Sequence, residues 1–253
     1  MTSTTIAAIG CTGPIGGLYV RDLLARGLHV RVLARDADSA RAAFPRADVQ
    51  AGSLLNPADV ARALDGVDAA LAVTPMGMRN DPEPEIAAGR AIASGAAAAQ
   101  VPHLIYTSVL GADHRRGVGV LDAKFEIERL LADAGVPCSI LRCGSYMEDV
   151  FDSRVEMLRK GRWLFPVTAT RRFTYTSQHD IPRFVAEALI AGQQVLGGAV
   201  NFVSPGTFSV SEVEELLSRA AGWKIRALPK MPVFYAFKAL QPVFNYRNSR
   251  FSS

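Results

Sequence analysis

A regular alternation of short apolar runs with helix-like segments fills the first 142 residues of this chain. The apolar runs are rich in residues that favour strands, and the segments between them have the spacing of amphipathic helices. Strands are expected at residues 5–9, 28–34, 47–51, 68–73, 103–107 and 137–141, and helices near 15–26, 38–44, 57–64, 83–99 and 120–134. Because such strands are joined by right-handed crossovers, the pattern predicts an α/β fold with a doubly wound parallel sheet.

After residue 142 the alternation becomes less regular. A helix is expected within residues 145–161, a strand within 171–177, a helix at 180–192 capped by Asp180, a late strand at 199–203 and a helix at 209–222 with a Ser211–Glu214 capping pattern. We therefore expect a core domain over residues 1–142, and a region over 143–253 that returns to the sheet and forms a small substrate lobe over its carboxyl edge.

Composition excludes several classes of protein. Hydrophobic residues make up 49% and charged residues 21% of the chain, as in ordinary globular domains. The net charge of +4 is spread out, and the densest basic clusters, Arg115–Arg116 and Arg171–Arg172, are only pairs, which argues against nucleic-acid binding. No apolar run approaches the about 18 residues of a membrane span, and no secretory signal is recognised, so a cytoplasmic location is expected.

The three cysteines, Cys11, Cys138 and Cys143, have no metal-type spacing and no accompanying histidine pair. Their odd number and scattered positions favour reduced thiols in or near a core. We expect no metal site.

Three glycines, Gly10, Gly13 and Gly16, lie where the first expected strand meets the first expected helix, in the stretch "IGCTGPIGG". In a doubly wound sheet this turn is the usual pyrophosphate site, because glycine lets backbone N–H groups approach a phosphate and the helix N-terminus attracts negative charge. A tight turn without a ligand can use the same residues. Their place in the first turn of a long β/α series favours dinucleotide binding.

The end of the second expected strand bears on the choice of dinucleotide. An acidic residue there would bind the ribose 2′-hydroxyl of NAD, whereas an arginine can bind the 2′-phosphate of NADP through two parallel hydrogen bonds. The sequence places Arg35 there, followed by Asp36. Arg35 favours NADP(H), and Asp36 leaves NAD as the less favoured alternative.

Several segments together resemble the NmrA-like, atypical branch of the extended short-chain dehydrogenase/reductases. They are "GCTGPIGG", "VRVLARD", "GVDAALAVTP", "VPHLIYTSVLGAD", the lone Lys124 and "AGVPCSILRCGSYMEDV", within residues 5–205. The resemblance implies a Rossmann domain that binds NADP(H) and a small C-terminal substrate lobe. Members of the family include quinone and isoflavone reductases, and also regulators that bind the nucleotide without turning it over.

The glycine turn and the resemblance together give a set of expected cofactor-binding residues. They are Gly10, Thr12, Gly13, Pro14, Ile15, Gly16, Arg35, Ser53, Leu54, Val73, Thr74, Pro75, Thr107, Lys124, Cys143, Gly144 and Ser145. The chain departs from the family at Ser53, where an Asp is common, and at Cys143, where Pro-Gly is common. The first departure weakens the expected contact with adenine.

Ordinary short-chain dehydrogenases use a Tyr-x-x-x-Lys pair, one helical turn apart, but here Val120 stands four residues before Lys124. We expect Lys124 and Ser108 to be the catalytic residues. A lysine can donate a proton if partial burial lowers its pKa toward neutral. A surface lysine on an amphipathic helix is the alternative for Lys124, and a loop-capping serine for Ser108. Tyr106 is expected to point away from Thr107 and is given no role.

Further residues near the ligand edge are expected to line a substrate pocket, which suits an aromatic or quinone-like compound. They are Met76, Met78, His114, Tyr146, Met147 and Phe151. Apolar packing between the two lobes would leave the same pattern, and His114 can equally be an exposed loop histidine. Cys143 is expected to be an inert thiol.

The sequence thus predicts an NADPH-dependent reductase of a conjugated or aromatic carbonyl, quinone-like or natural-product compound. Two alternatives stay open: an NADP(H)-sensing regulator without turnover, favoured by the missing tyrosine, and a non-redox enzyme that uses the nucleotide structurally. The expected partner is a small-molecule substrate, and the expected state is a monomer or homodimer.

Overall fold

A computed structural model describes residues 4–75, 81–148, 155–163, 172–192 and 198–227 of the chain. It divides into two compact units. The first comprises Met1–Gly144 and Thr176–Val203, and the second comprises Ser145–Tyr175 and Ser204–Ser253. The chain therefore leaves the first unit after Gly144 and returns to it at Thr176.

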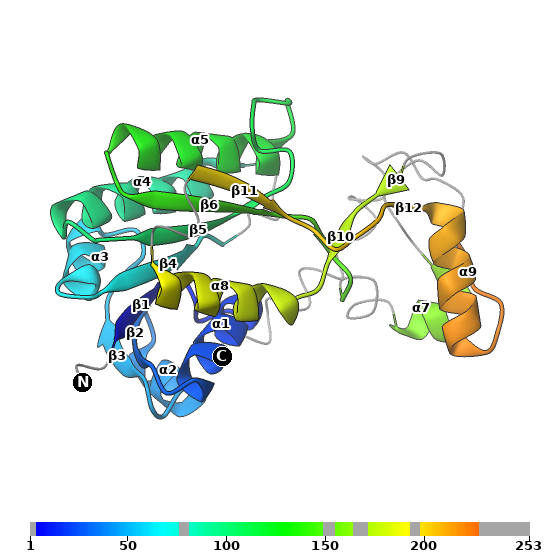
Figure 1. The fold of residues 1–253 in the computed structure, drawn as a ribbon, viewed down its shortest axis with the longest axis horizontal. Helices are drawn as coiled ribbons and strands as arrows, with labels where there is room; N and C mark the ends of the chain where they lie inside the picture. The colour runs from blue at the N-terminus through cyan, green and yellow to red at the C-terminus, as the bar shows by residue number, and fades with distance from the viewer. Residues whose placement is uncertain (1–3, 76–80, 149–154, 164–171, 193–197, 228–253) are drawn as a thin grey trace. The chain divides into compact units, whose positions relative to one another are not determined.

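The first unit is built around a seven-stranded sheet (Figure 1) in which all neighbouring strands are parallel. Its strands are β1 (Thr5–Ile9), β2 (His29–Ala34), β3 (Asp48–Ala51), β4 (Ala69–Val73), β5 (Leu104–Val109), β6 (Cys138–Cys143) and β11 (Gly198–Phe202), in the order β11-β6-β5-β4-β1-β2-β3. The order reverses between β1 and β4, which confirms the predicted doubly wound, Rossmann-type sheet. Sheets of this kind bind ligands outside the carboxyl ends of the strands at such a reversal.

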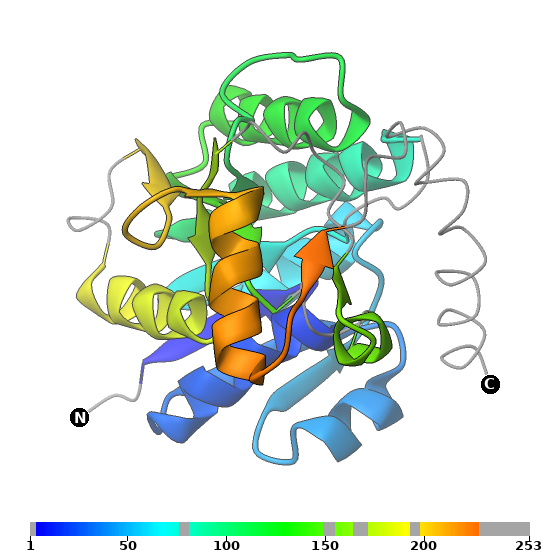
Figure 2. The same ribbon diagram turned by 90° about the vertical axis from the view of Figure 1, so that its right-hand side faces the viewer.

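Helices cover both faces of this sheet. They are α1 (Pro14–Ala25), α2 (Ala37–Ala43), α3 (Pro57–Leu64), α4 (Glu83–Ala98), α5 (Gly119–Asp133) and α8 (Asp180–Ala191). Helices α3, α4 and α5 pack in a row on one face, and α1 packs against α8 on the other (Figures 1 and 2). The bounds agree with the sequence predictions to within a residue or two. Asn56, for example, caps α3 by accepting a hydrogen bond from Ala58 N, with Pro57 in the first turn.

Two glycines of α4 let its neighbours approach closely. A Cβ atom at Gly89 would lie 2.3 Å from Cγ1 of Ile127 in α5, and one at Gly95 would lie 2.7 Å from Cβ of Val60 in α3. Ile92 and Ile127 are fully buried between these helices and the sheet. The side chains of α4 and α5 that face the carboxyl edge of the sheet are consequently held close together.

The second unit has a core of its own around the fully buried Trp163. Its elements are β7 (Ser145–Tyr146), α7 (Val155–Arg159), β8 (Arg162–Trp163), β9 (Arg172–Phe173), β12 (Phe208–Ser209), α9 (Val210–Ala221) and β13 (Arg226–Ala227), and β10 (Tyr175–Thr176) spans its border with the first unit. These strands pair two at a time, β10 with β7, β12 with β9 and β13 with β8.

Two predicted helix caps are wrong. The capping box of α9 consists of Ser209 and Glu212, because Ser209 has the extended backbone that a cap needs, whereas Ser211 is already helical. Asp180 is the first residue of α8, and no side chain caps that helix.

Two predicted segments are interrupted. The strand expected within residues 171–177 is split at Thr174 into β9 and β10. The helix expected within 145–161 is described only as β7 and α7, and the aromatic tail after residue 227 lies outside the described residues.

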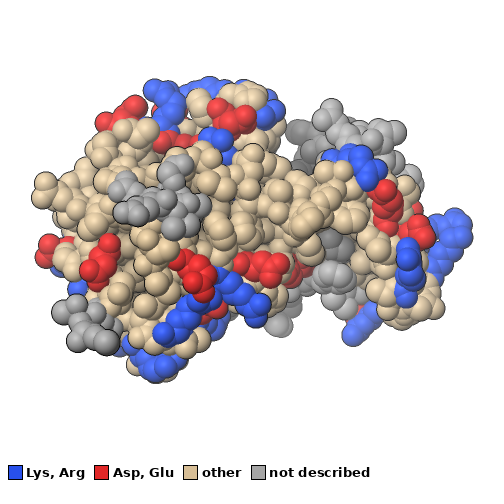
Figure 3. All heavy atoms as spheres, in the orientation of Figure 1, with Lys and Arg blue, Asp and Glu red and all other residues tan. Residues whose placement is uncertain are grey.

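Charge on the described surface is mixed. On the face drawn in Figure 3, most of the first unit carries neither acidic nor basic side chains, and those that are visible lie in mixed groups along its upper and lower parts, without a large patch of one sign. None of the described helices combines the length and apolar character that crossing a membrane requires. Within the same residues, no group of His, Cys, Asp and Glu is arranged to hold a metal ion.

Candidate functional site

Gly10 joins the glycine turn to the carboxyl end of β4. Its φ of +72° is a conformation that favours glycine, and a Cβ atom there would lie 1.9 Å from the carbonyl oxygen of Val73. The same position is 3.4 Å from Cδ2 of Leu54, which follows β3. The turn thus brings Gly10, Leu54 and Val73, all expected cofactor residues, to one point on the ligand edge.

Gly13 is different, because neither its backbone nor its packing in this structure requires a glycine. It is the N-cap residue of α1 with φ −79° and ψ 176°, and a Cβ atom there would meet no described residue within 4 Å other than its chain neighbours. Thr12 and Pro14 beside it are exposed. Gly16, in contrast, packs its Cα against the turn, since a Cβ there would lie 2.4 Å from Cα of Cys11. The N-terminus of α1 is therefore open, as anion binding requires.

The two residues after β2, Arg35 and Asp36, differ in whether the folded chain engages their side chains. Asp36 is the N-cap of α2, and its carboxylate accepts a hydrogen bond of 3.0 Å from Ser39 N. Arg35 is exposed, and its guanidinium makes no hydrogen bond or ion pair with the described part of the chain. Arg35 is hence available to a ligand, whereas Asp36 is engaged by its own helix.

Lys124 of α5 is buried, with 5% of its side chain exposed. Its Nζ atom lies 3.0 Å from Oε1 of Glu85, 2.8 Å from Oγ1 of Thr74 and 3.3 Å from the carbonyl oxygen of Thr107. Thr74 also donates a 2.8 Å hydrogen bond to Glu85 and lies 2.9 Å from the hydroxyl of Tyr106. The alternative that Lys124 is a surface lysine is therefore wrong.

Donors and acceptors in this cluster can be assigned by counting hydrogens. An ammonium has three N–H groups, and Lys124 has three oxygen acceptors. Because the hydroxyl hydrogen of Thr74 goes to Glu85, the hydroxyl of Tyr106 must donate to Thr74. The cluster is thus satisfied with a charged lysine, a charged glutamate and a neutral tyrosine.

The pKa of Lys124 is raised, contrary to the sequence-based expectation that burial would lower it. Burial does act to lower the pKa of this amine, but interaction with Tyr106 and the negative charge of Glu85 outweigh that effect. Burial raises the pKa of Tyr106, which keeps the phenol protonated. Lys124 is therefore a fixed cation in this arrangement and a poor proton donor.

Glu85 was missed from the sequence and Tyr106 was given no role, whereas both side chains belong to this cluster. A signal for Glu85 was available, since it lies four residues before Gly89 and seven before Ile92, on the buried stripe of α4. The sequence also singles out Lys124 in another way. It is the only lysine among residues 1–159, and the other permanently basic residues of that range are arginines.

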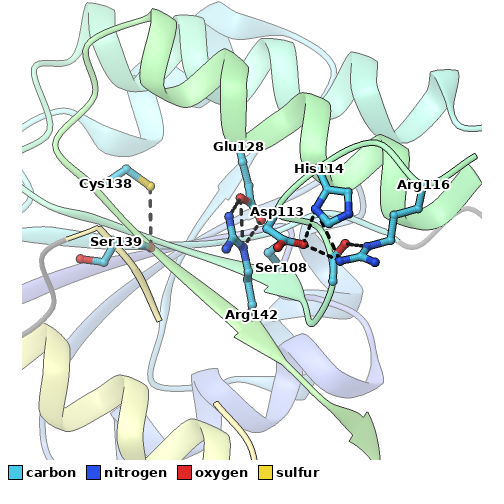
Figure 4. Close-up of polar contacts among 9 residues, drawn as sticks. Ser108, Asp113, His114, Arg116, Glu128, Cys138, Ser139 and Arg142 are labelled. Atoms are coloured by element: carbon cyan, nitrogen blue, oxygen red, sulfur yellow. Dashed lines mark hydrogen bonds and ion pairs between the residues drawn. The ribbon is translucent and has the colours of Figure 1, made fainter. Parts of the chain in front are cut away.

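Ser108 lies on the same face of β5 as Tyr106 but takes part in a second polar cluster (Figure 4). Its hydroxyl donates a 2.5 Å hydrogen bond to Oε1 of Glu128, and the guanidinium of Arg142 binds both oxygens of Glu128. This arrangement joins the ends of β5 and β6 to α5 one helical turn after Lys124. Glu128 and Arg142 were also missed.

A cavity of about 190 Å³ lies at the carboxyl ends of β5, β6 and β11. It is lined by Leu110, Gly111, Asp113, Arg116, Arg142 and Asn201. Figure 4 shows Asp113 and His114 together with Arg116 in the loop after β5. Nδ1 of His114 is 3.2 Å from Asp113, and its side chain is 58% exposed.

Three of the expected cofactor residues, Cys143, Gly144 and Ser145, lie at the carboxyl end of β6. Burial raises the pKa of Cys143 to about 12, so its thiol stays protonated, and all three cysteines are free. Gly144 N donates to the carbonyl of Phe202 and to the hydroxyl of Thr176. Ser145 is exposed.

The expected substrate residues are only partly described. Tyr146 and Met147 belong to the second unit, where Met147 packs against the core around Trp163. Met76, Met78 and Phe151 lie outside the described residues.

The model of the NmrA-like family matches residues 2–249 of this chain. The chain belongs to the NmrA-like family. Among its curated relatives, an NAD(P)H azoreductase of Xenophilus azovorans is 27% identical over 223 residues, which cover 87% of this chain and 75% of the relative.

Solved structures show the same fold as this NmrA-like chain. An NADPH-dependent quinone oxidoreductase of Escherichia coli, crystallised with NADPH, superposes with a TM-score of 0.80 at 23% identity, over 94% of this chain and 82% of its own. The negative transcriptional regulator NmrA superposes with a TM-score of 0.75 at 22% identity, over 98% of this chain and 84% of its own. The solved structures with this fold thus include both an enzyme and a regulator.

Proposed function

We propose that this NmrA-like protein is an NADPH-dependent reductase that transfers hydride to a conjugated or aromatic carbonyl, quinone-like or related natural-product compound. The observation that carries the proposal is the buried ammonium of Lys124, held against the carbonyl of Thr107 at the carboxyl end of β5. That is the edge at which doubly wound sheets bind nucleotides. The reductases among the relatives support the same class of reaction.

The described residues fit NADPH at three points. The open N-terminus of α1 at Gly13 suits the pyrophosphate, and Arg35, which has no partner among the described residues, suits the 2′-phosphate. Thr107 and Lys124 suit the nicotinamide ribose. The chemistry that the bound nucleotide supplies is hydride transfer from C4 of nicotinamide.

The protein's own contribution to this reaction is binding, orientation and charge. Lys124 would anchor a ribose hydroxyl, and its positive charge would stabilise negative charge that develops on the acceptor oxygen. Ser108 and Cys143 would border the site. Because Lys124 is held as a cation, the proton that completes the reduction would come from water or from a loop residue such as His114.

A regulator that binds NADPH without turnover is the second candidate. The specific observation in its favour is Val120, which stands where ordinary short-chain dehydrogenases have their catalytic tyrosine. In that case the cluster around Lys124 would serve nucleotide binding alone.

The test measures NADPH oxidation by absorbance with a panel of quinones, enones, imines and azo compounds. A reductase should oxidise NADPH with at least one of them and show saturation. Gly13→Val is the control, since it should remove activity together with NADPH binding. Tight binding of NADPH without oxidation by any compound would favour the regulator, and failure to bind NADPH would refute both candidates.

A further inference from the structure

We propose that Glu85 is a positioning residue that fixes Lys124 as a permanent cation at the ligand edge. The inference rests on the proposed function in one respect, namely that Lys124 faces the nicotinamide ribose. It goes further because it assigns a role to Glu85. This residue lies on α4, the helix after β4, whereas Lys124 lies on α5, the helix after β5.

The ammonium of Lys124 has an acceptor for each of its three N–H groups. Glu85 and Thr74 accept the two shorter contacts of Lys124, at 3.0 and 2.8 Å, and the carbonyl of Thr107 accepts the longest, at 3.3 Å. Glu85 and Thr74 are joined to each other by a 2.8 Å hydrogen bond. The contact with Thr107 is therefore the one most easily exchanged. A ribose hydroxyl that replaced it would leave Lys124 with three acceptors.

Close packing of α4 against α5 brings Glu85 to Lys124. Gly89 lies one turn after Glu85 on α4, and Ile127 lies nearly one turn after Lys124 on α5. Because Gly89 has no Cβ, Ile127 can pack against the backbone of α4. This close approach holds the carboxylate and the ammonium at a fixed separation, with only 1% and 5% of the two side chains exposed.

Other charged and titratable groups also lie near the ammonium of Lys124. Tyr106 of β5 has its ring centroid 5.1 Å from Nζ, and the thiol of Cys143 on β6 is close enough for the charge of Lys124 to act on it. Burial keeps both groups in their neutral forms, the phenol and the thiol. Glu128, one turn further along α5, is bound by Arg142. Glu85 is thus the carboxylate that compensates the charge of Lys124.

The charge can be measured directly because the chain has five lysines. In protein labelled with ¹³C-lysine, the Cε resonance of Lys124 is assigned as the one absent from Lys124→Arg, and its shift is followed with pH. In the wild type it should not titrate below the pH at which exposed lysines do. In Glu85→Gln its midpoint should fall by about one to three pH units, the usual effect of one close opposite charge. An unchanged midpoint would overturn the proposal.

Tyr106→Phe is the matched control, because it removes one hydrogen bond of the cluster without changing its charge. Its Lys124 midpoint should fall by less than that of Glu85→Gln, because Tyr106 contributes to the raised pKa of Lys124 as a protonated phenol, whereas Glu85 contributes a full negative charge. A shift as large as that of Glu85→Gln would mean that general loosening of the cluster, and not the carboxylate, sets the charge.

NADPH binding by a second variant, Glu85→Asp, distinguishes the effect of the carboxylate's position from the effect of its charge. It also tests the proposal if the Glu85→Gln variant fails to fold. Glu85→Asp keeps the charge but withdraws it by one methylene, so NADPH affinity should fall severalfold without a new pH dependence. Wild-type affinity in Glu85→Asp would overturn the positioning role. If the wild type itself does not bind NADPH, the proposed function fails, while the titration of Lys124 still decides whether Glu85 fixes its charge.

Discussion

The Nζ atom of Lys124 lies 3.0 Å from Oε1 of Glu85, and neither side chain exposes more than 5% of its surface. Taking two charges out of water is costly, and their attraction repays that cost only while both are present. Removing one partner should therefore destabilise the folded protein, because the other charge stays buried without compensation. This asymmetry gives the first prediction.

Lys124→Met should destabilise the protein by about 3–5 kcal/mol, because it leaves the carboxylate of Glu85 buried without its cation. The double variant Lys124→Met/Glu85→Gln should be more stable than Lys124→Met alone. Urea unfolding of the wild type, both single variants and the double variant measures the coupling. Additive losses would show that the two side chains do not interact as a pair.

Gly13→Ala should weaken NADPH binding by tenfold or more, about 1.4 kcal/mol, while leaving the free energy of unfolding within about 0.5 kcal/mol of the wild type. A Cβ at this position approaches no other described part of the chain within 4 Å, so a loss of affinity without a loss of stability would point to contact with the ligand. Calorimetry with NADPH and urea unfolding provide the two measurements.

Gly10→Ala is the contrasting variant to Gly13→Ala. Its φ of +72° and the 1.9 Å approach to the carbonyl oxygen of Val73 should make it destabilising. If Gly13→Ala bound NADPH normally, the turn would not hold a phosphate.

Arg35→Ala should raise the dissociation constant of NADPH by tenfold or more and leave that of NADH nearly unchanged, since only NADPH has the 2′-phosphate. One charge-assisted hydrogen bond contributes roughly 1.5–3 kcal/mol. Binding of both nucleotides to both proteins is compared by calorimetry.

The control for Arg35→Ala is Arg41→Ala, which removes the same charge from an exposed side chain of α2 that pairs with Asp38. It should affect neither nucleotide strongly. An equal loss for NADPH and NADH in Arg35→Ala would contradict the assigned contact.

The parts of the site that could be predicted from the sequence are those that depend only on residues close together along the chain. The turn from Gly10 to Gly16 could be found because three glycines between a strand and a helix are a local pattern. Arg35 could be found because it ends a strand. That Asp36 is occupied by capping α2 is also local, and an N-cap position was recognisable in principle from the helix that follows it.

The cluster around Lys124 could not be predicted in the same way, because its groups come from α4, β5, α5 and the residue that follows β4. Strand alternation correctly turned Tyr106 away from the side of Thr107, but it could not show that Thr74 and Lys124 lie on that other face. The direction of the pKa shift of Lys124 was predicted wrongly for the same reason, because the neighbours of its ammonium were not known from the sequence. Burial alone lowers the pKa of a lysine, and only the presence of Glu85 and Tyr106 reverses it.

His103 gives a prediction about pH and stability. Its imidazole is 3% exposed, its Nε2 lies 2.9 Å from the hydroxyl of Ser139, and its Nδ1 has no hydrogen-bond partner among the described residues. Burial lowers the pKa of His103 below the value of about 6.5 that an unfolded chain has. The unfolded state consequently binds more protons than the folded state as pH falls below that value.

The stabilising contribution of a neutral His103 should therefore be complete above about pH 6.5 and lost as the pH falls toward its folded pKa, with a slope of at most about 1.4 kcal/mol per pH unit. Urea unfolding between pH 8 and 5 should show a smaller loss of stability for His103→Gln than for the wild type. His29→Gln is the control, because it removes an exposed histidine in place of a buried one. Identical slopes for the wild type and His103→Gln would mean that His103 takes up its proton equally in both states, and that its burial between β5 and β6 does not set the acid stability of the sheet.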